Sequence, residues 1–256
     1  MSDFRIDQIT NQAGTAGPDI AGITTFSGSS GLLMPSGDTF RRSVIENVVE
    51  EGLVLYLDAG NDVSYPGSGN KWFDLSGNGN TGTLVNGVGY SASNGGALSF
   101  DGTDDYVLTP VNIDANPNTV SAWFNASATN GARGIVITDN GGWDKGFEIT
   151  DGVFNIHAGD NLSSTGVSAL SNTWYFGTIV YTSISMSFYI NGVNIWNGGA
   201  PGGTSGSTVE IGRANYNAGG GSRFFIGNIA QVSIYNRALS AAEVSQNFNA
   251  LKGRYT

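Results

Sequence analysis

The chain has no cysteine and only one histidine among its 256 residues. Disulfide bonds and thiolate metal sites are therefore excluded, and a single histidine argues against zinc. Charged residues are scarce, at 12% of the chain, and the 11 basic residues are outnumbered by 21 acidic ones. The resulting net charge of −10 argues against nucleic acid as a partner, and an anionic membrane surface would repel such a protein.

Long apolar stretches are also lacking. No run approaches the roughly 18 apolar residues of a membrane-spanning helix. The segment Met1–Asp7 has no apolar core of the kind that a secretory signal contains. We therefore expect a protein that is made in the cytoplasm and does not insert into a membrane.

Glycine, by contrast, is abundant, with 39 residues, and hydrophobic residues make up 39% of the chain. Short β-branched and aromatic runs alternate with Gly/Asn-rich turns from about residue 52 to residue 236, and no helical pattern interrupts them. This succession is typical of an all-β fold. The sequence predicts a two-sheet antiparallel sandwich.

Two tight hairpins have a register that can be read from the sequence. Asp151-Gly152 predicts a turn that pairs Ile149 with Phe154, and Asn191-Gly192 predicts one that pairs Phe188 with Ile195. Because side chains alternate between faces, eight residues are expected in the core. They are Phe147, Ile149, Phe154, Ile156, Phe188, Ile190, Val193 and Ile195. The opposite face of the first hairpin carries Glu148, Asn155 and His157.

The end of the chain predicts one helix over residues 241–251. Ser240 followed by Glu243 forms a capping-box pattern. Val244, Phe248 and Leu251 then recur at helical spacing, as one apolar stripe. We expect this helix to pack on the sandwich.

The first part of the chain, residues 1–50, differs in composition from residues 51–256. It is rich in Gly, Ser and Thr, with two short apolar segments at 4–9 and 20–26. These have little to bury by themselves. We interpret residues 1–50 as an extended arm for assembly or anchoring, and 51–256 as the folded domain; the alternative is a disordered leader.

One acidic turn is a candidate metal site. Asp101, Asp104 and Asp105 lie within five residues, and Asp58 on the first strand is a fourth candidate ligand. Calcium is coordinated by six to eight oxygens, which carboxylates supply. The alternative is a solvated turn in which Asp101 binds its own loop backbone.

Several motifs resemble one family. They are Gly52–Asp58, the loop WFDLSGNGNTGTL at 72–84, LSFDGTDDYV at 98–107, FYINGVNIW at 188–196 and residues 225–240. Together they resemble the laminin-G-like, concanavalin A-type jelly roll. This resemblance implies a jelly-roll fold, but its function stays open, because the fold hosts lectins, adhesion modules, hydrolases and spacers.

Further segments resemble virion structural proteins of tailed phages, in particular cyanophages. They are Leu55–Asn61, Phe248–Tyr255 and the arm segments 20–26 and 26–37. The resemblance implies a capsid-decoration, tail or fibre component, located in the virion. Its arm would contact sister copies, as a homo-oligomer, and other virion proteins. Ala230-Gln231 stands where related domains often carry an acidic pair, which weakens a calcium role.

The sequence shows no convergent catalytic set, so we predict that the protein is not an enzyme. His157 has no nucleophile motif beside it, and paired acids are not evident on one strand. We expect instead a surface-displayed jelly roll that either binds host glycans or only decorates and stabilises the shell. The candidate glycan-binding residues are Trp143, Asp144, Trp196, Asn215 and Tyr216. The alternatives are a free calcium-dependent lectin module and a glycan hydrolase or lyase.

Overall fold

The structure, a computed structural model, describes residues 32–33, 39–40, 47–138, 144–159, 162–203, 206–216 and 221–255. The chain divides into two compact units, Met1–Val44 and Ile45–Thr256. In the first unit, β1 (Leu32–Leu33) pairs antiparallel with β2 (Thr39–Phe40). The strands predicted at 4–9 and 20–26 lie outside the described residues.

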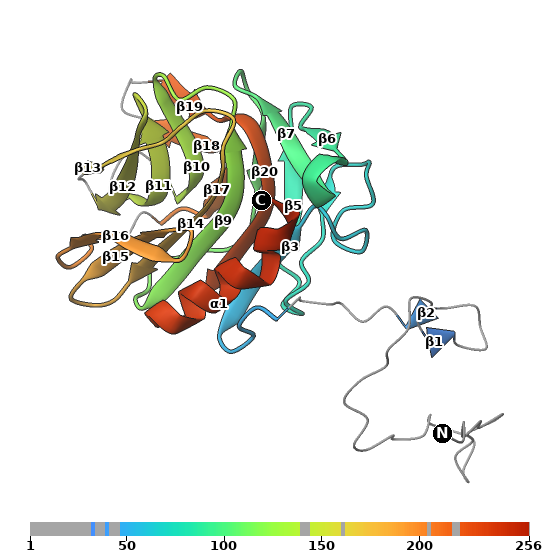
Figure 1. Cartoon of the computed structure of the whole chain (residues 1–256), viewed down its shortest axis with the longest axis horizontal. Helices are drawn as coiled ribbons and strands as arrows, with labels where there is room; N and C mark the ends of the chain where they lie inside the picture. The colour runs from blue at the N-terminus through green and yellow to red at the C-terminus, as the bar shows by residue number, and fades with distance from the viewer. Residues whose placement is uncertain are drawn as a thin grey trace, which may run out of the picture. The chain divides into compact units, whose positions relative to one another are not determined.

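The second unit is a sandwich of two antiparallel sheets, which confirms the predicted fold class (Figure 1). In order across sheet 1, the strands are β13 (Leu162–Ser168), β12 (Val153–Gly159), β11 (Asp144–Thr150), β10 (Ala132–Thr138), β17 (Val209–Ile211), β8 (Tyr106–Leu108), β5 (Gly82–Val85) and β4 (Lys71–Trp72). In sheet 2 they are β16 (Val193–Gly198), β15 (Met186–Ile190), β14 (Trp174–Tyr181), β9 (Asn118–Ala126), β20 (Ile226–Tyr235), β7 (Ala97–Asp101) and β6 (Gly89–Ser91), with β3 (Leu53–Asp58) also paired to β20.

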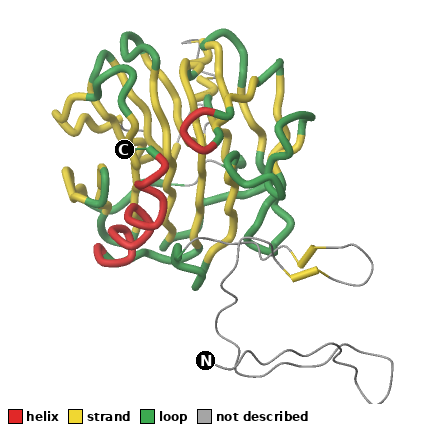
Figure 2. Tube along the Cα trace, turned by 45° about the vertical axis from the view of Figure 1, so that its right-hand side comes forward, coloured by secondary structure: helices red, strands yellow, loops and turns green. Residues whose placement is uncertain are grey.

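A hairpin, an α-helix and two 3-10 turns complete the fold. The strands β18 (Arg213–Tyr216) and β19 (Gly221–Phe224) form a separate hairpin. The helix α1 (Ala241–Leu251) runs in front of β9 and β20 in Figure 1, and the tube in Figure 2 shows it as the longest helix of the unit. Single 3-10 turns span Ser93–Gly95 and Lys252–Arg254.

The core lies between the two sheets and is rich in aromatic rings. Phe147 of sheet 1 and Phe124 of sheet 2 approach with ring centroids 6.1 Å apart. Close approach at this point depends on Gly177 of β14, because a Cβ there would lie 2.8 Å from the Phe147 ring. Phe154 also contacts Phe124, with ring centroids 6.4 Å apart. Apolar alternation on the inner strands thus produced the expected face-to-face packing.

The first predicted hairpin register is confirmed. Ile149 pairs with Phe154 and Phe147 with Ile156, and all four are buried. The second register is only partly correct. Phe188 pairs with Trp196 instead of Ile195, because a bulge between Phe188 and Tyr189 shifts the partner strand by one residue.

Two of the eight predicted core residues lie elsewhere than expected. Val193 is 64% exposed. It pairs with Ile190 directly after the turn, on β16, which is the last strand at one end of sheet 2 among the described strands. Ile195 is only partly buried, although it packs against the core together with Trp196. Period-two alternation cannot show how much of an edge strand the opposing sheet covers.

The edge of β3 is covered by the loop that follows β4. The side chains of Ser76, Asn78 and Asn80 donate hydrogen bonds to the carbonyl oxygen of Val54, at 3.0, 3.4 and 2.9 Å. The Asp74 carboxylate organises this loop by accepting the backbone N–H groups of Ser76 and Asn80, each at 2.9 Å. The Gly/Asn-rich motif therefore replaces a neighbouring strand and protects an exposed sheet edge.

The helix α1 begins and ends as predicted. The Ser240 side chain accepts the backbone N–H of Glu243, and the Glu243 carboxylate accepts the N–H of Ser240. Phe248 stacks on Trp123 of β9, with ring centroids 5.6 Å apart. The helix therefore covers the outer face of sheet 2. Among the described residues, no helix has the length and apolar character needed to cross a membrane.

Candidate functional site

The outer face of sheet 1 gathers polar side chains from neighbouring strands. On β11, alternation places Asp144 and Glu148 on the same face. His157 of β12 pairs with Gly146, which lies between those two acids. On the other side of β11, Gly146 pairs with Ile137 of β10, and Ile137 pairs with Glu210 of β17. Directly paired residues share a face, so three carboxylates and a histidine lie on one side of the sheet.

Glu148 is the buried centre of this arrangement. Its side chain is 0% exposed, yet it accepts hydrogen bonds from Arg223 at 3.0 and 3.1 Å and lies 3.1 Å from His157 Nε2. Burial by itself would raise the pKa of Glu148, but His157, Thr150 and Arg223 stabilise the carboxylate and hold the pKa below its ordinary value. Glu148 is therefore held as an anion.

The β18–β19 hairpin packs against this outer face. At Gly134 of β10 the approach is so close that a Cβ would lie 2.4 Å from the backbone nitrogen of Ala214. Arg213 of β18 forms a two-pronged ion pair with Glu210 and lies over the Tyr106 ring, with its Cζ 3.6 Å from the centroid. Arg223 of β19 reaches Glu148. Two ion pairs thus fasten the hairpin to sheet 1.

We call this set the outer polar face of sheet 1. Its members are Tyr106, Asp144, Glu148, His157, Glu210, Arg213 and Arg223. The sequence signal for Glu210 is its place between Val209 and Ile211, as the polar residue of an alternating strand. The two arginines carry no such signal, because their contacts depend on how the hairpin folds back.

The predicted glycan-binding residues are only partly brought together. Asp144 is buried on β11, within the outer polar face. Trp196 lies on β16 of the other sheet and packs against the core, so it does not join Asp144. Asn215 and Tyr216 are on β18, above sheet 1, but their side chains are outside the described part of the chain. Trp143 is also outside the described residues.

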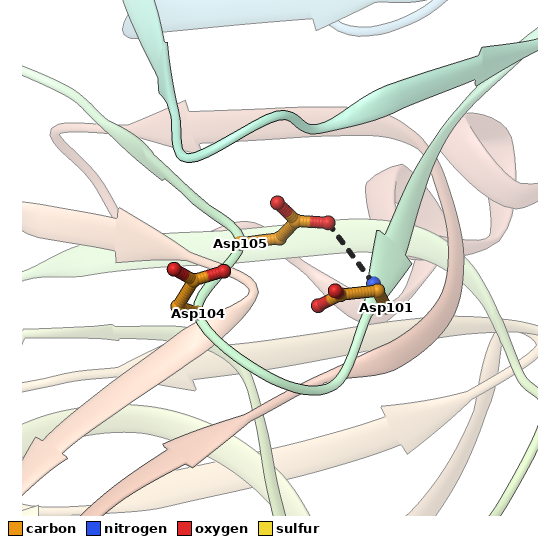
Figure 3. Close-up of side chains that lie close together, drawn as sticks. All are labelled: Asp101, Asp104 and Asp105. Carbon is orange, nitrogen blue, oxygen red and sulfur yellow. Dashed lines mark hydrogen bonds between the residues drawn. The ribbon is translucent and has the colours of Figure 1, made fainter.

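The predicted carboxylate cluster does form at the β7–β8 turn (Figure 3). Oxygens of Asp101, Asp104 and Asp105 lie within 4.8 Å of one another. Asp105 accepts the backbone N–H of Asp101 at 3.0 Å, and Asp101 accepts that of Thr103 at 2.7 Å. Burial, followed by the charges of Asp101 and Asp104, raises the pKa of Asp105. The turn is thus closed by its own backbone bonds, and its three acids repel one another.

Asp58 does not join this cluster, which corrects the sequence-based prediction. Its carboxylate is engaged by Arg254, with Nη1 at 2.9 Å from both oxygens, and accepts the backbone N–H of Gly60 at 2.9 Å. Sequence alternation could not reveal this, because Arg254 comes from the last turn of the chain, 196 residues away.

Calcium binding to the carboxylate cluster remains a hypothesis with a direct test. An ion that neutralises the three acids and binds only the folded state raises the melting temperature by mass action. We expect millimolar calcium to raise it relative to chelator, and Asp104→Asn to abolish the rise. Asp62→Asn, an acid outside the cluster, is the control. Identical melting curves with calcium and with chelator would leave a turn closed by hydrogen bonds alone.

The environment of Glu148 predicts a pH dependence of stability. Its folded-state pKa is lowered, so its contribution is present above the unfolded value near 4.5 and is lost as pH falls toward the folded value. In urea unfolding, Glu148→Gln should be less stable than the wild type at neutral pH. The difference between the two proteins should shrink as the pH falls below this unfolded-state value. A difference independent of pH would show that the charge of Glu148 is not stabilised.

Comparison with known families identifies the domain. Residues 101–245, more than half of the chain, match the model of the concanavalin A-like lectin/glucanase superfamily. The chain belongs to this superfamily, and the predicted laminin-G-like jelly roll is confirmed. No curated protein matches the sequence.

Solved structures share this fold at low sequence identity. Domain 4 of a GH43 extracellular arabinanase from Geobacillus stearothermophilus, in complex with arabinotriose, has a TM-score of 0.58 and 18% identity, with 76% of this chain and 97% of that domain covered. A Trypanosoma rangeli sialidase mutant displaying trans-sialidase activity has a TM-score of 0.62 and 18% identity, covering 82% of this chain and 34% of the sialidase. The binding domain of botulinum neurotoxin DC in complex with SialylT has a TM-score of 0.59 and 15% identity, with 79% of this chain and 52% of that chain covered.

The prediction that the protein is not an enzyme is contradicted. Proteins with this fold include the arabinanase and the sialidase. The reasoning behind that prediction also fails on geometry. The sequence placed one carboxylate, Glu148, on the face of His157, whereas in the structure Asp144 of β11 and Glu210 of β17 lie on the same face.

Proposed function

We propose that the domain recognises glycans on the outer polar face of sheet 1. The observation that carries this proposal is the meeting of carboxylates, a histidine and a ring-stacked arginine from neighbouring strands on one face. Sugar hydroxyls both donate and accept hydrogen bonds, so they suit carboxylates beside guanidinium groups. The superfamily and the arabinotriose bound to a protein of similar fold support the same chemistry.

The ion pairs make this face rigid before any ligand arrives. Arg213 is held between Glu210 and the Tyr106 ring, and Glu148 is held by Arg223. A group already fixed in position loses little conformational entropy when a ligand binds. The Glu210 and Arg213 side chains are 11% and 14% exposed, and Leu108, the partner of Glu210 on β8, is 37% exposed. This pair therefore lies beside the accessible part of the face.

A matched pair of variants tests the proposal. Glu210 and Glu243 are both glutamates paired with an arginine, but only Glu210 lies on the outer polar face. In a glycan-array screen of the full chain, Glu210→Gln should reduce binding at least about tenfold, which corresponds to 1.4 kcal/mol. Glu243→Gln should bind like the wild type. Equal binding by both variants, or no glycan bound by the wild type, would contradict the proposal.

A second candidate function, glycoside cleavage, is favoured by the three carboxylates on one face. Such hydrolysis uses two carboxyl groups on opposite sides of the scissile bond. Asp144 and Glu210 come from strands separated by β10, and Glu148 lies further along β11. Oligosaccharide release detected by mass spectrometry, and abolished by Asp144→Asn, would support cleavage. Binding with intact glycan would assign the face to recognition.

We also propose that the domain is displayed on a virion, with residues 1–50 as the anchoring arm. The support is the resemblance of Leu55–Asn61, Phe248–Tyr255 and the arm segments to tailed-phage structural proteins. Display of many copies would strengthen weak single sites, because later contacts are effectively intramolecular. The full chain should form homo-oligomers and be retained on purified particles, whereas residues 45–256 should be monomeric. Equal assembly of both forms would contradict the arm.

A further inference from the structure

A lysine lies inside the sandwich, at a position where strand alternation would place an apolar residue. On β11, Phe147 and Ile149 face the core, and Lys145 falls on the same side of the strand. Lys145 is 0% exposed. Moving an ammonium group out of water is costly unless other groups replace the water around it. The reason for this lysine must therefore be found in its partners.

The buried ammonium group is surrounded by three oxygens from one short segment. Its Nζ donates to the backbone carbonyl oxygens of Ile113 and Asp114, at 2.9 and 2.6 Å, and to Asn116 Oδ1 at 2.9 Å. The Tyr181 ring lies nearby, with its centroid 5.5 Å from Nζ. All three acceptors belong to residues 113–116, which lie between β8 and β9. This segment thus encloses the ammonium group as a loop encloses a bound ion.

The number of acceptors identifies the charged form of Lys145. A neutral amine has two N–H groups and cannot donate to three acceptors, whereas an ammonium group has three. Burial lowers the pKa of Lys145, while the negative charge of Asp114 acts in the opposite direction. Carbonyl oxygens that converge on one charge are also the groups by which proteins hold a bare potassium ion. We call the three oxygens of residues 113–116 the oxygen cage.

The oxygen cage is also held by bonds that do not involve the lysine. Asn118 Nδ2 donates to the carbonyl oxygen of Ile113 at 2.9 Å and to Asn116 Oδ1 at 3.3 Å. The backbone N–H of Gly206 donates to the Asp114 carboxylate at 2.9 Å. These bonds support the positions of the cage oxygens whichever cation lies between them. The cage is therefore a property of the segment itself.

We propose that residues 113–116 form a monovalent-cation site, which the chain fills with a cation of its own, the Lys145 ammonium group. The stem of the lysine tethers this cation to β11, so its binding costs little translational freedom. The segment between β8 and β9 is then held in place without a dissolved ion. Potassium and ammonium, with the same charge and similar size, are the ions that the cage accepts when the lysine is shortened. The site does not depend on the function proposed for the outer polar face.

The test is a chemical rescue of the full chain carrying Lys145→Ala. This substitution removes the tethered cation and leaves room for a free one. The variant should unfold at a lower urea concentration than the wild type, and potassium or ammonium chloride should raise that midpoint in a saturable manner, by mass action. Choline chloride, whose cation is too large for the cage, is the control at equal ionic strength. Because each sample is refolded in its own salt, the ion needs no path into the folded protein.

Two further variants separate this site from a general effect of salt. Lys145→Met keeps most of the stem but carries no charge, so it should be destabilised by the unsatisfied oxygens and should respond equally to potassium and choline. Lys252→Ala, at an exposed lysine, should unfold like the wild type in every salt. Equal responses of Lys145→Ala to potassium, ammonium and choline would overturn the proposal. A Lys145→Met variant as stable as the wild type would do the same.

A measurement on the wild type covers the case in which Lys145→Ala folds in none of these salts. In ¹H–¹⁵N NMR spectra of the full chain, the Lys145 side chain should give the signal of an ammonium group at neutral pH. Its hydrogens should exchange slowly with solvent, because all three N–H bonds are engaged, whereas those of the exposed Lys252 should exchange fast. A neutral amine at Lys145, or exchange as fast as at Lys252, would overturn the proposal.

Discussion

Replacing Phe154 by alanine is expected to lower the free energy of unfolding by about 3–5 kcal/mol, through lost burial and the cavity left behind. Phe154 is 0% exposed. Its ring contacts those of Phe124, Tyr175 and Phe188, with centroids 6.4, 5.2 and 6.2 Å apart. Because Phe154 is on sheet 1 and all three of these rings are on sheet 2, the truncation removes packing that holds the two sheets together. Urea unfolding followed by tryptophan fluorescence measures the loss.

The control for this prediction is Val193→Ala. The hydrophobic pattern alone places Val193 in the core with Phe154, whereas the structure leaves it 64% exposed on an edge strand. Its truncation should change the free energy of unfolding by less than about 0.5 kcal/mol. A loss of less than about 1 kcal/mol for Phe154→Ala, or a large loss for Val193→Ala, would mean that the strand registers are wrong.

The second large effect is expected at the C-terminal end of the chain. Arg254→Met should destabilise the domain by about 3 kcal/mol, the lower end of the range for breaking a buried ion pair. Asp58 is 1% exposed and its charge would lose the guanidinium that contacts both its oxygens. The lower end applies because the Arg254 side chain is 20% exposed, so solvent already screens part of the interaction.

Lys252→Met is the matched control for the Arg254 variant. Lys252 is two residues away and exposed; its ammonium group donates to Asn249 Oδ1 at 2.7 Å and lies 5.8 Å from the Phe248 ring centroid. Its removal should have little effect on unfolding. Adding Asp58→Asn to Arg254→Met should recover part of the stability, because the unpaired charge is then gone. Failure of the double variant to recover would argue that Asp58 is not the source of the loss.

Local patterns were sufficient for much of the fold. The Asp151-Gly152 turn set the β11–β12 register, and Ser240 with Glu243 set the start of α1. These features depend on residues close in sequence, where backbone geometry and hydrogen bonding leave few choices. The predicted β15–β16 register failed at a bulge between Phe188 and Tyr189, about which the Asn191-Gly192 turn carries no information.

The candidate site was less accessible to sequence reasoning. His157 and Glu148 were placed together because they belong to one hairpin, and the carboxylate cluster because its members lie in one turn. Glu210 joins them only because its strand, β17, pairs with β10, which is the neighbour of β11 in sheet 1. That pairing is a property of the whole sheet.

What the sequence determined by itself is the all-β class, the local hairpins and turns, the capped helix and the exclusion of thiolate chemistry. Each follows from composition or from spacing over a few residues. The tertiary structure alone decided three partnerships: Asp58 with Arg254, Glu210 with Arg213 over Tyr106, and Glu148 with Arg223. The physical reason is that a charged or amide group pairs with whichever partner the packed strands bring within about 3 Å, and side-chain periodicity carries no information about that partner.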